Sequence, residues 1–374
     1  MAFPHTMRLV LAGILSIPAL LVLLAVAPIL VFLSIPSLAI LVRRKRNFFP
    51  SFTQTDSTRC SLLQHAVVTG GSSGIGLSIA VELAKRGCEN ITILARKESQ
   101  LAEAKKLVEE TVAVSKIKGA KAATSVRTVS IDITDDKALI KVAETLCGEV
   151  GAPTLIFNCA GVSVPLDFED LSTSTFRSQV NLNYLGSTYI VKTFLPYMKK
   201  HIGGNIILTS SMSGQTGTYG YSGYASTKFA LRGFAECLAM ELAADKSNVN
   251  IMLAYPPDTN TPGYETENKN KPEACRLISE SGGIWEPDVV GGKIVKEALR
   301  SNPTFDIYFG IDGWMLSMLT SGMNPVTSVV DALCQVALMG LLRFISLFYL
   351  MDFGRVTQKC VDAQIQAKEE SKED

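Results

Sequence analysis

Tyr224 and Lys228 lie four residues apart in a segment with helical periodicity. In a helix this spacing puts both side chains on one face. A tyrosine phenol titrates near about pH 10, and a nearby ammonium group favours its phenolate, which brings it into use as an acid and base at neutral pH. Tyr219 and Tyr221 have a glycine and an alanine at the same spacing. We therefore predict that Tyr224 transfers a proton, with an exposed helical pair as the alternative interpretation.

Ser211 follows a strand-like apolar run and precedes Tyr224 in the same segment. Its hydroxyl can hold a substrate oxygen near Tyr224 and donate a hydrogen bond to a developing alkoxide. Ser211, Tyr224 and Lys228 together indicate hydride transfer between a nicotinamide cofactor and a carbonyl or alcohol carbon.

A glycine-rich turn at 69–76 offers a site for such a cofactor. Its glycines let backbone N–H groups approach a pyrophosphate, and the following helix begins with partial positive charge. The spacing differs by one residue from GxGxxG, and a surface turn is the alternative, but the strand-like run before it and the helical pattern after it favour the cofactor. The residues predicted to bind there are Gly70, Ser72, Ser73, Gly74, Ile75 and Gly76.

Arg96 ends the second strand-like run, where an NAD enzyme usually has an acidic residue for the ribose 2′-hydroxyl. The forked donors of arginine fit a 2′-phosphate, and Ser72 can add a hydrogen bond, so we predict NADPH; a solvated surface arginine is the alternative. Asp132 is placed to meet the adenine amino group. Further cofactor contacts are predicted at Asn158, Ala160, Gly161, Tyr224, Lys228, Pro256 and Thr259.

Strand-like runs alternate with helical patterns through the middle of the chain. The runs lie at 65–69, 91–95, 128–131, 154–158, 205–210 and 250–255, and the helical patterns at 76–86, 99–116, 138–149, 176–200 and 224–244. This alternation predicts an α/β fold with a doubly wound, mostly parallel, Rossmann-like sheet.

The motifs TGGSSGIG at 69–76, NCAG at 158–161, Ser211 and YASTK at 224–228 resemble, in this order, the short-chain dehydrogenase/reductase family. The resemblance covers residues 64–262 and implies the catalytic set Ser211, Tyr224, Lys228 and Asn183. By the family pattern, Asn183 holds a water in a proton relay through Lys228. Pro257 is a departure, because the family usually has glycine there.

The runs AYPPDT at 254–259, YASTKFALRG at 224–233 and GMNPVTS at 322–328 are similar to the branch of this family that works in sphingolipid synthesis. That resemblance implies NADPH-dependent reduction of the ketone of a long-chain sphingoid base. A membrane-anchored reductase of a steroid, retinoid or other lipid ketone would share every catalytic residue and stays open. A non-catalytic NADPH-binding scaffold is a further alternative, against which the intact catalytic set argues.

Two apolar stretches flank the predicted catalytic domain. The stretch at 9–42 has no charged residue and exceeds the roughly 20 residues that a transmembrane helix needs. The basic cluster at 43–46 then places the rest of the chain in the cytosol. A signal peptide is the competing interpretation, but its apolar region would be only about 7–15 residues. The stretch at 326–351 is interrupted by Asp331, Gln335 and Arg343. It can be interpreted as a core helix, an interfacial helix or a re-entrant membrane segment, and we favour membrane association.

These features predict a membrane anchor at 1–47, a linker at 48–62, a catalytic domain at 63–310 with a substrate loop at 256–285, and a C-terminal membrane-associated region with a charged tail at 311–374. We expect the protein to be anchored in the endoplasmic reticulum membrane, with its catalytic domain facing the cytosol. The 36 basic and 35 acidic residues give no reason to expect a nucleic-acid partner, and the scattered cysteines and histidines predict no metal site. The expected partners are the lipid ketone and membrane lipid; a homo-oligomer is compatible with the sequence.

Overall fold

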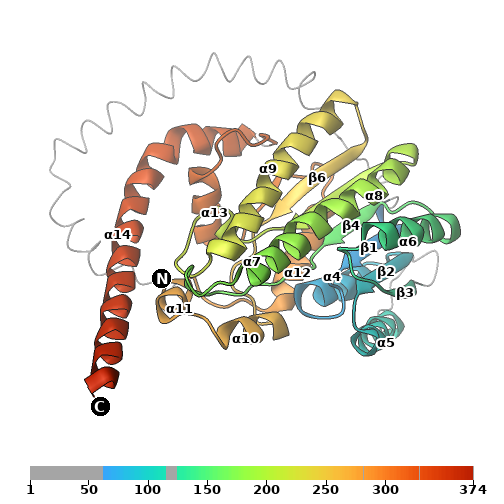
Figure 1. Ribbon diagram of the computed structural model, residues 1–374. Helices are drawn as coiled ribbons and strands as arrows, with labels where there is room; N and C mark the ends of the chain where they lie inside the picture. Colours follow the sequence, from blue (N-terminus) through green and yellow to red (C-terminus); the bar gives the residue numbers. More distant parts are fainter. Residues whose placement is uncertain (1–61, 115–123, 281, 328, 374) are drawn as a thin grey trace.

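A seven-stranded parallel sheet forms the centre of the protein (Figure 1). The computed structural model describes residues 62–114, 124–280, 282–327 and 329–373. The strands are β1 (His65–Thr69), β2 (Asn90–Ala95), β3 (Ser125–Ser130), β4 (Leu155–Asn158), β5 (Gly204–Thr209), β6 (Val249–Ala254) and β7 (Asp306–Ile307). The predicted doubly wound sheet is confirmed, with β7 as an additional strand. The predicted anchor and the linker up to residue 61 lie outside the described residues.

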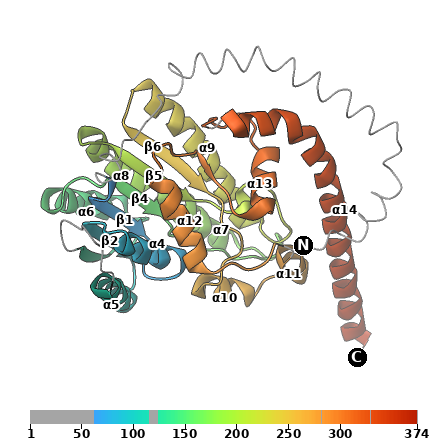
Figure 2. The same cartoon turned by 180° about the vertical axis from the view of Figure 1, so that it is seen from behind.

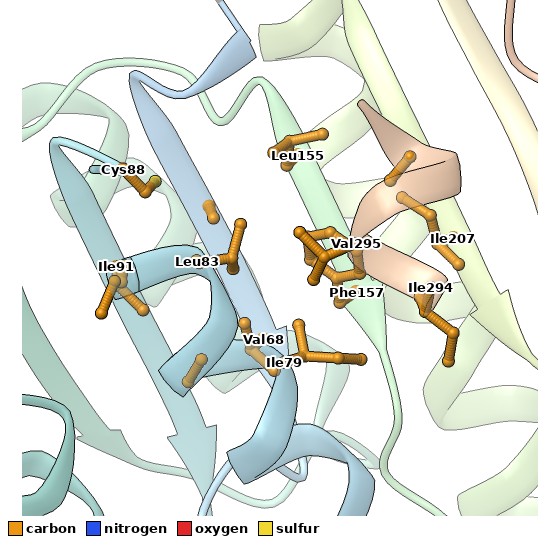
Figure 3. Packing of buried hydrophobic residues seen from close by; sticks show 14 of the residues in the cluster. Val68, Ile79, Leu83, Cys88, Ile91, Leu155, Phe157, Ile207, Ile294 and Val295 are labelled. Carbon is orange, nitrogen blue, oxygen red and sulfur yellow. The ribbon is translucent and has the colours of Figure 1, made fainter. Parts of the chain in front are cut away.

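Helices cover both faces of the sheet, as Figures 1 and 2 show. One face is covered by α4 (Gly74–Lys85), α5 (Glu98–Val114) and α12 (Pro287–Ala298), and the other by α6 (Asp136–Glu149), α8 (Ser187–Lys200) and α9 (Ser222–Ala244). In Figure 3, Ile79 of α4 and Ile294 of α12 lie over Val68 and Phe157 of the central strands. Strands covered on both sides must be apolar throughout, which explains the continuous runs in the sequence.

The strand order, β3-β2-β1-β4-β5-β6-β7, reverses direction between β1 and β4. At such a point the connections leave the sheet toward opposite faces, and a crevice opens beyond the carboxyl ends of the two strands. Thr69 ends β1 and Asn158 ends β4, paired side by side in the sheet. The glycine turn and the NCAG motif therefore meet at this crevice.

The helix predicted at 176–200 consists of three pieces. It begins as α7 (Thr173–Gln179), continues as the π-helix η1 (Val180–Gly186), and then becomes α8. Single-turn π segments inside α-helices occur frequently at functional sites. Here the wider turn contains Asn183, whose side chain is fully buried.

The predicted substrate loop contains two helices, α10 (Pro262–Asn268) and α11 (Glu273–Glu280). Its two ends are held together, because the Trp285 amide donates to the Asp258 carbonyl at 2.9 Å and the Asn260 amide donates to the Trp285 carbonyl at 2.8 Å. The segment thus leaves the sheet after β6 and returns to its starting point before α12.

The C-terminal apolar stretch belongs to α14 (Val329–Glu373), which begins beside α13 (Gly310–Leu319) and then projects from the body (Figures 1 and 2). By length and composition, Val330–Ala367 is the one helix in the described part of the chain that is able to cross a membrane, with a mean hydropathy of 1.8 in its most apolar window. Only 6% of that window is buried in the protein, so the interpretation as a core helix does not fit.

Candidate active site

Ser211, Tyr224 and Lys228 come together at the carboxyl end of β5. Ser211 follows this strand by two residues, and its hydroxyl lies close enough to Tyr224, in the first turn of α9, to influence the pKa of the phenol. Lys228 lies one turn further along, with Nζ 5.5 Å from the centroid of the Tyr224 ring. The Lys228 ammonium also donates to the Thr209 carbonyl at 2.8 Å, which fixes it at the end of the strand.

Burial controls the protonation of this group. It raises the pKa of the Tyr224 phenol above its ordinary value; the negative charge of Glu267 adds to the rise, while the hydrogen bond from Ser211 opposes it. Burial also lowers the pKa of Lys228 to about 8. The sequence suggested that Lys228 would favour the phenolate, but burial and Glu267 outweigh that effect. Tyr224 therefore keeps its proton at neutral pH, which is the form that a proton donor needs.

Asn183 connects the loop after β4 to α9. Its side chain accepts a hydrogen bond from the Val162 amide at 2.8 Å and donates to the Val162 carbonyl at 2.8 Å and to Thr227 Oγ1 at 3.1 Å. A Cβ added to Gly161 would meet Asn183 Oδ1 at 3.2 Å and Lys228 Nζ at 3.6 Å. Asn183 thus lies beside Lys228, where the family pattern expects it; its part in a water relay stays a prediction.

The glycine turn follows β1 and packs closely against neighbouring segments. Gly70 has φ +63°, and a Cβ there would lie 2.9 Å from the backbone of Ala160. Gly74 has φ +53°, and a Cβ there would meet Thr261 Cγ2 at 2.9 Å. The Ser73 side chain makes no capping hydrogen bond at the beginning of α4, so the N–H groups of the first turn have no side-chain cap. A side chain at Gly70 or Gly74 would push the turn away from Ala160 or Thr261, so both positions require glycine.

Arg96 and Asp132 lie at the ends of neighbouring strands. Arg96 is exposed directly after β2, and its backbone carbonyl accepts a hydrogen bond from Ser130 Oγ at 2.9 Å. Asp132 accepts hydrogen bonds from the amide and the hydroxyl of Thr134, at 2.9 and 2.8 Å. Although partial burial opposes it, these bonds and the charge of Arg96 lower the pKa of Asp132. The contacts of Arg96 and Ser72 with a 2′-phosphate, and of Asp132 with adenine, stay predictions.

Thr69 is a residue of this site that the sequence reasoning did not assign. Its buried hydroxyl donates to Asn158 Oδ1 at 2.8 Å and accepts from the amides of Cys159 and Ala160, both at 3.1 Å. Asn158 in turn donates to the Ser187 carbonyl at 3.0 Å. Thr69 therefore fixes the NCAG segment against the glycine turn. Its place as the last residue of β1 is the signal by which it was detectable.

Pro256 and Thr259 lie where β6 gives way to the substrate loop. The Pro256 carbonyl accepts a hydrogen bond from the Met212 amide at 3.2 Å, next to Ser211. The Thr259 hydroxyl is buried and donates to the Pro257 carbonyl at 2.8 Å. Their contacts with a cofactor stay predictions, whereas Thr261 is the residue that touches the glycine turn.

A buried charged cluster joins the substrate loop to the catalytic helix. Lys271 Nζ lies 2.9 Å from Glu267 Oε1 and 3.5 Å from Asp258 Oδ2, and the Lys271 side chain is 1% exposed. Its ammonium also lies over the rings of Tyr221 and Tyr264, at 5.5 and 4.9 Å from their centroids. Tyr221 donates a hydrogen bond to Glu267. We refer to these five residues as the loop cluster. In the sequence, nothing distinguishes its three charged residues from solvated surface charges.

Comparison with known proteins identifies the family. A family model described as short chain dehydrogenase matches residues 64–272. The chain belongs to the short-chain dehydrogenase family. It is therefore an oxidoreductase of a family that uses nicotinamide cofactors, and the resemblance found in its motifs is confirmed.

Relatives with similar sequences extend over most of both chains. A Bos taurus protein named 3-ketodihydrosphingosine reductase is 44% identical over 298 residues, which cover 79% of this chain and 86% of the relative. A Danio rerio protein named 3-dehydrosphinganine reductase is 42% identical over 308 residues, covering 81% and 88%. An Arabidopsis thaliana protein of the latter name is 34% identical over 299 residues, covering 79% and 86%.

The glycine turn fits the dinucleotide of this family. The N–H groups at the uncapped beginning of α4 match the requirements of a pyrophosphate, and the glycines allow the tight turn before it. A bound nicotinamide would supply the hydride. Tyr224, Ser211 and the buried ammonium of Lys228 lie beyond the carboxyl end of the neighbouring strand β5, where they could act on a substrate oxygen.

Proposed function

We propose that this protein reduces the ketone of 3-ketodihydrosphingosine to the alcohol of dihydrosphingosine, with NADPH as the reductant. The observation that carries the reaction is the placement of the Tyr224 ring 5.5 Å from the buried ammonium of Lys228, with Ser211 close enough to influence the pKa of the phenol. The substrate is supported by the names of relatives that match about four fifths of the chain.

The proposed reaction adds a hydride to the ketone carbon and a proton to its oxygen. Ser211 donates a hydrogen bond to that oxygen, and Tyr224 gives it the proton. Lys228 holds positive charge next to the phenol, which stabilises the phenolate left behind. Asn183 positions the loop at Val162 and, with Lys228, would return a proton to Tyr224 through a water.

NADPH is proposed over NADH because of the side chain that follows the end of β2. Arg96 stands there, and its guanidinium would bind the 2′-phosphate with help from Ser72. The residues at 70–76 would hold the pyrophosphate, and Asp132 the adenine. Asn158, Ala160, Gly161, Pro256 and Thr259 would line the nicotinamide half of the site.

The substrate assignment is tested by parallel assays of NADPH oxidation in detergent micelles. We expect kcat/KM for 3-ketodihydrosphingosine to exceed that for a steroid ketone by at least about 100-fold, because a site built for one ligand's polar groups rejects analogues that lack them. Turnover of the steroid ketone alone would overturn the substrate assignment. Turnover of neither ketone would count against the proposed reduction itself.

We also propose that the protein works at the endoplasmic reticulum membrane, anchored through residues 1–47 and associated through 311–374, with the catalytic domain at 63–310 in the cytosol. Support comes from α14, whose first half exposes large apolar side chains: Val330, Leu333, Val336, Met339, Leu341, Phe344, Leu347, Leu350 and Met351. A long-chain ketone partitions into the bilayer, so an enzyme held at the surface can collect it there.

In sealed endoplasmic reticulum vesicles we expect the full chain to stay with the membrane after an alkaline wash. Added protease should digest the catalytic domain without detergent, because the domain faces the cytosolic side. Loss of the chain in the wash would contradict the anchoring. Protection of the catalytic domain until detergent is added would contradict its orientation.

A further inference from the structure

The loop cluster brings negative charge close to the reacting phenol. Tyr221 donates to the Glu267 carboxylate, and the rings of Tyr221 and Tyr224 lie with centroids 5.4 Å apart. Glu267 is therefore separated from the proton donor by a single intervening ring. The negative charge of Glu267 acts on the Tyr224 phenol, because after burial this charge is the largest cause of the raised pKa of Tyr224.

The loop cluster has more carboxylates than cations. Glu267 and Asp258 both face Lys271, which is the one cation within ion-pair distance of either carboxylate in the described part of the chain. The Glu267 side chain is 12% exposed and that of Asp258 is 25% exposed. Two carboxylates therefore share one ammonium, and the contacts that Glu267 receives from Lys271 and from Tyr221 are both made to its Oε1. A pair of carboxylates with a single cation favours a ligand with positive charge.

The proposed substrate carries such a charge next to its reacting carbon. A 2-amino-3-ketone has its ammonium group on the carbon bonded to the carbonyl carbon. When the carbonyl oxygen lies between Ser211 and Tyr224, the ammonium must lie within a few bonds of the phenol. It then enters the negative field of Glu267.

We propose that Glu267 recognises the substrate ammonium and so makes the enzyme selective for 2-amino ketones over neutral lipid ketones. This inference rests on the proposed function, because the sphingoid ketone places an amino group at that position, whereas a steroid or retinoid ketone does not. Tyr221 and Lys271 hold the Glu267 carboxylate toward the catalytic helix. Asp258 shares Lys271 with Glu267, although burial raises the pKa of the Asp258 carboxyl.

The recognition also explains how a steroid or retinoid ketone is rejected. Such a ligand has no cation to pair with Glu267, and its apolar skeleton would remove water from the carboxylate without compensation. Hydrogen bonds to charged groups contribute enough to discriminate by about 10- to 100-fold. Selectivity therefore comes from a charge outside the set formed by Ser211, Tyr224 and Lys228.

The test compares two ketones that differ in one group. The first is 3-ketodihydrosphingosine, and the second is the same chain with hydrogen in place of the amino group. For wild-type enzyme we expect kcat/KM to be about 10- to 100-fold higher for the amino ketone. A wild-type ratio near one would overturn the inference, whether or not any variant folds.

Glu267→Gln is the matching variant, because glutamine keeps an oxygen acceptor for Tyr221 and Lys271 while removing the charge. We expect its amino-to-deamino ratio to fall at least about tenfold, with cofactor binding near that of wild type. The melting temperature should fall, because the buried Lys271 ammonium keeps only Asp258 as a charged partner. Glu265→Gln, an exposed change on the same helix α10, is the control and should keep the wild-type ratio.

The outcomes separate this inference from the proposed function. Equal losses on both ketones in Glu267→Gln would show a purely structural role and overturn the inference. Retention of the full ratio would overturn it as well, while leaving the proposed reduction intact. If wild-type enzyme reduces neither ketone, both the proposed function and the inference fail.

Discussion

Replacing Tyr224 with phenylalanine should lower kcat for ketone reduction by about 10²- to 10⁴-fold, the usual contribution of a positioned general acid. Phenylalanine keeps the ring against Tyr221 and under Lys228 but removes the proton that the substrate oxygen receives. The glycine turn and Arg96 are untouched, so the affinity for NADPH should stay within about threefold of wild type. Steady-state turnover and NADPH fluorescence titration measure the two quantities separately.

Tyr219→Phe is the matched control. Tyr219 lies five residues earlier, before α9 begins, and the pKa of its phenol is influenced by Asp167, whereas that of Tyr224 is influenced by Ser211. The same chemical change should therefore leave turnover near the wild-type value. If Tyr224→Phe turned over at the wild-type rate, another group would have to protonate the alkoxide, and the proposed catalytic set would be wrong. An equal loss in both variants would indicate a general disturbance of this segment.

The sheet was predictable from the sequence because each central strand is covered on both sides. Burial on two faces demands unbroken apolar runs, and those at 65–69 and 91–95 match β1 and β2 within one residue. The glycine turn and Tyr224 with Lys228 were detectable for a similar reason, because backbone approach and helical spacing leave a local trace. The short strand β7, with two residues, leaves none.

The rest of the site depends on contacts between distant segments. Helical periodicity over 176–200 does not reveal the π-helix that contains Asn183, since one wider turn changes the pattern very little. The burial of Lys271 is equally hidden, because its neighbours Asp258 and Tyr221 come from other elements. A charged run in a sequence is usually solvated. Here the substrate loop brings Glu267 and Lys271 against Tyr221, directly before α9, which gives both side chains a different environment.

The hydroxyl of Thr69 shows the same limit at the other end of the crevice. The sequence places it before Gly70, but only the pairing of β1 with β4 brings it to Asn158 and to the Cys159 and Ala160 amides. Catalytic side chains are thus visible in the sequence, while the groups that position them become visible only once the strands are paired. The catalytic residues can be predicted from their types and spacing in the sequence, whereas the residues that position them depend on how the strands pair.

Arg96→Asp should reverse the cofactor preference. The guanidinium that would attract the 2′-phosphate is replaced by a carboxylate that repels it and can accept a hydrogen bond from the 2′-hydroxyl of NADH. Because Arg96 is exposed, salt and water weaken its pairing, and a charge-assisted contact contributes about 1.5–3 kcal/mol, or roughly 10- to 100-fold. Because the variant should bind NADPH more weakly and NADH more tightly, the ratio of kcat/KM for NADPH over NADH should fall at least about 100-fold.

Lys200→Asp controls for the change in net charge, because Lys200 is exposed at the end of α8, which is the end of the helix remote from η1 and the crevice. It should keep the wild-type ratio at every salt concentration. In wild-type enzyme, KM for NADPH should rise with ionic strength more steeply than KM for NADH, since only NADPH carries the 2′-phosphate. If Arg96→Asp kept its preference for NADPH, the phosphate would have to be bound by other donors, such as Ser72 or Lys97. Arg96 would then be a solvated surface side chain. Ketone reduction, as opposed to alcohol oxidation, would then be supported only by the protonated phenol of Tyr224.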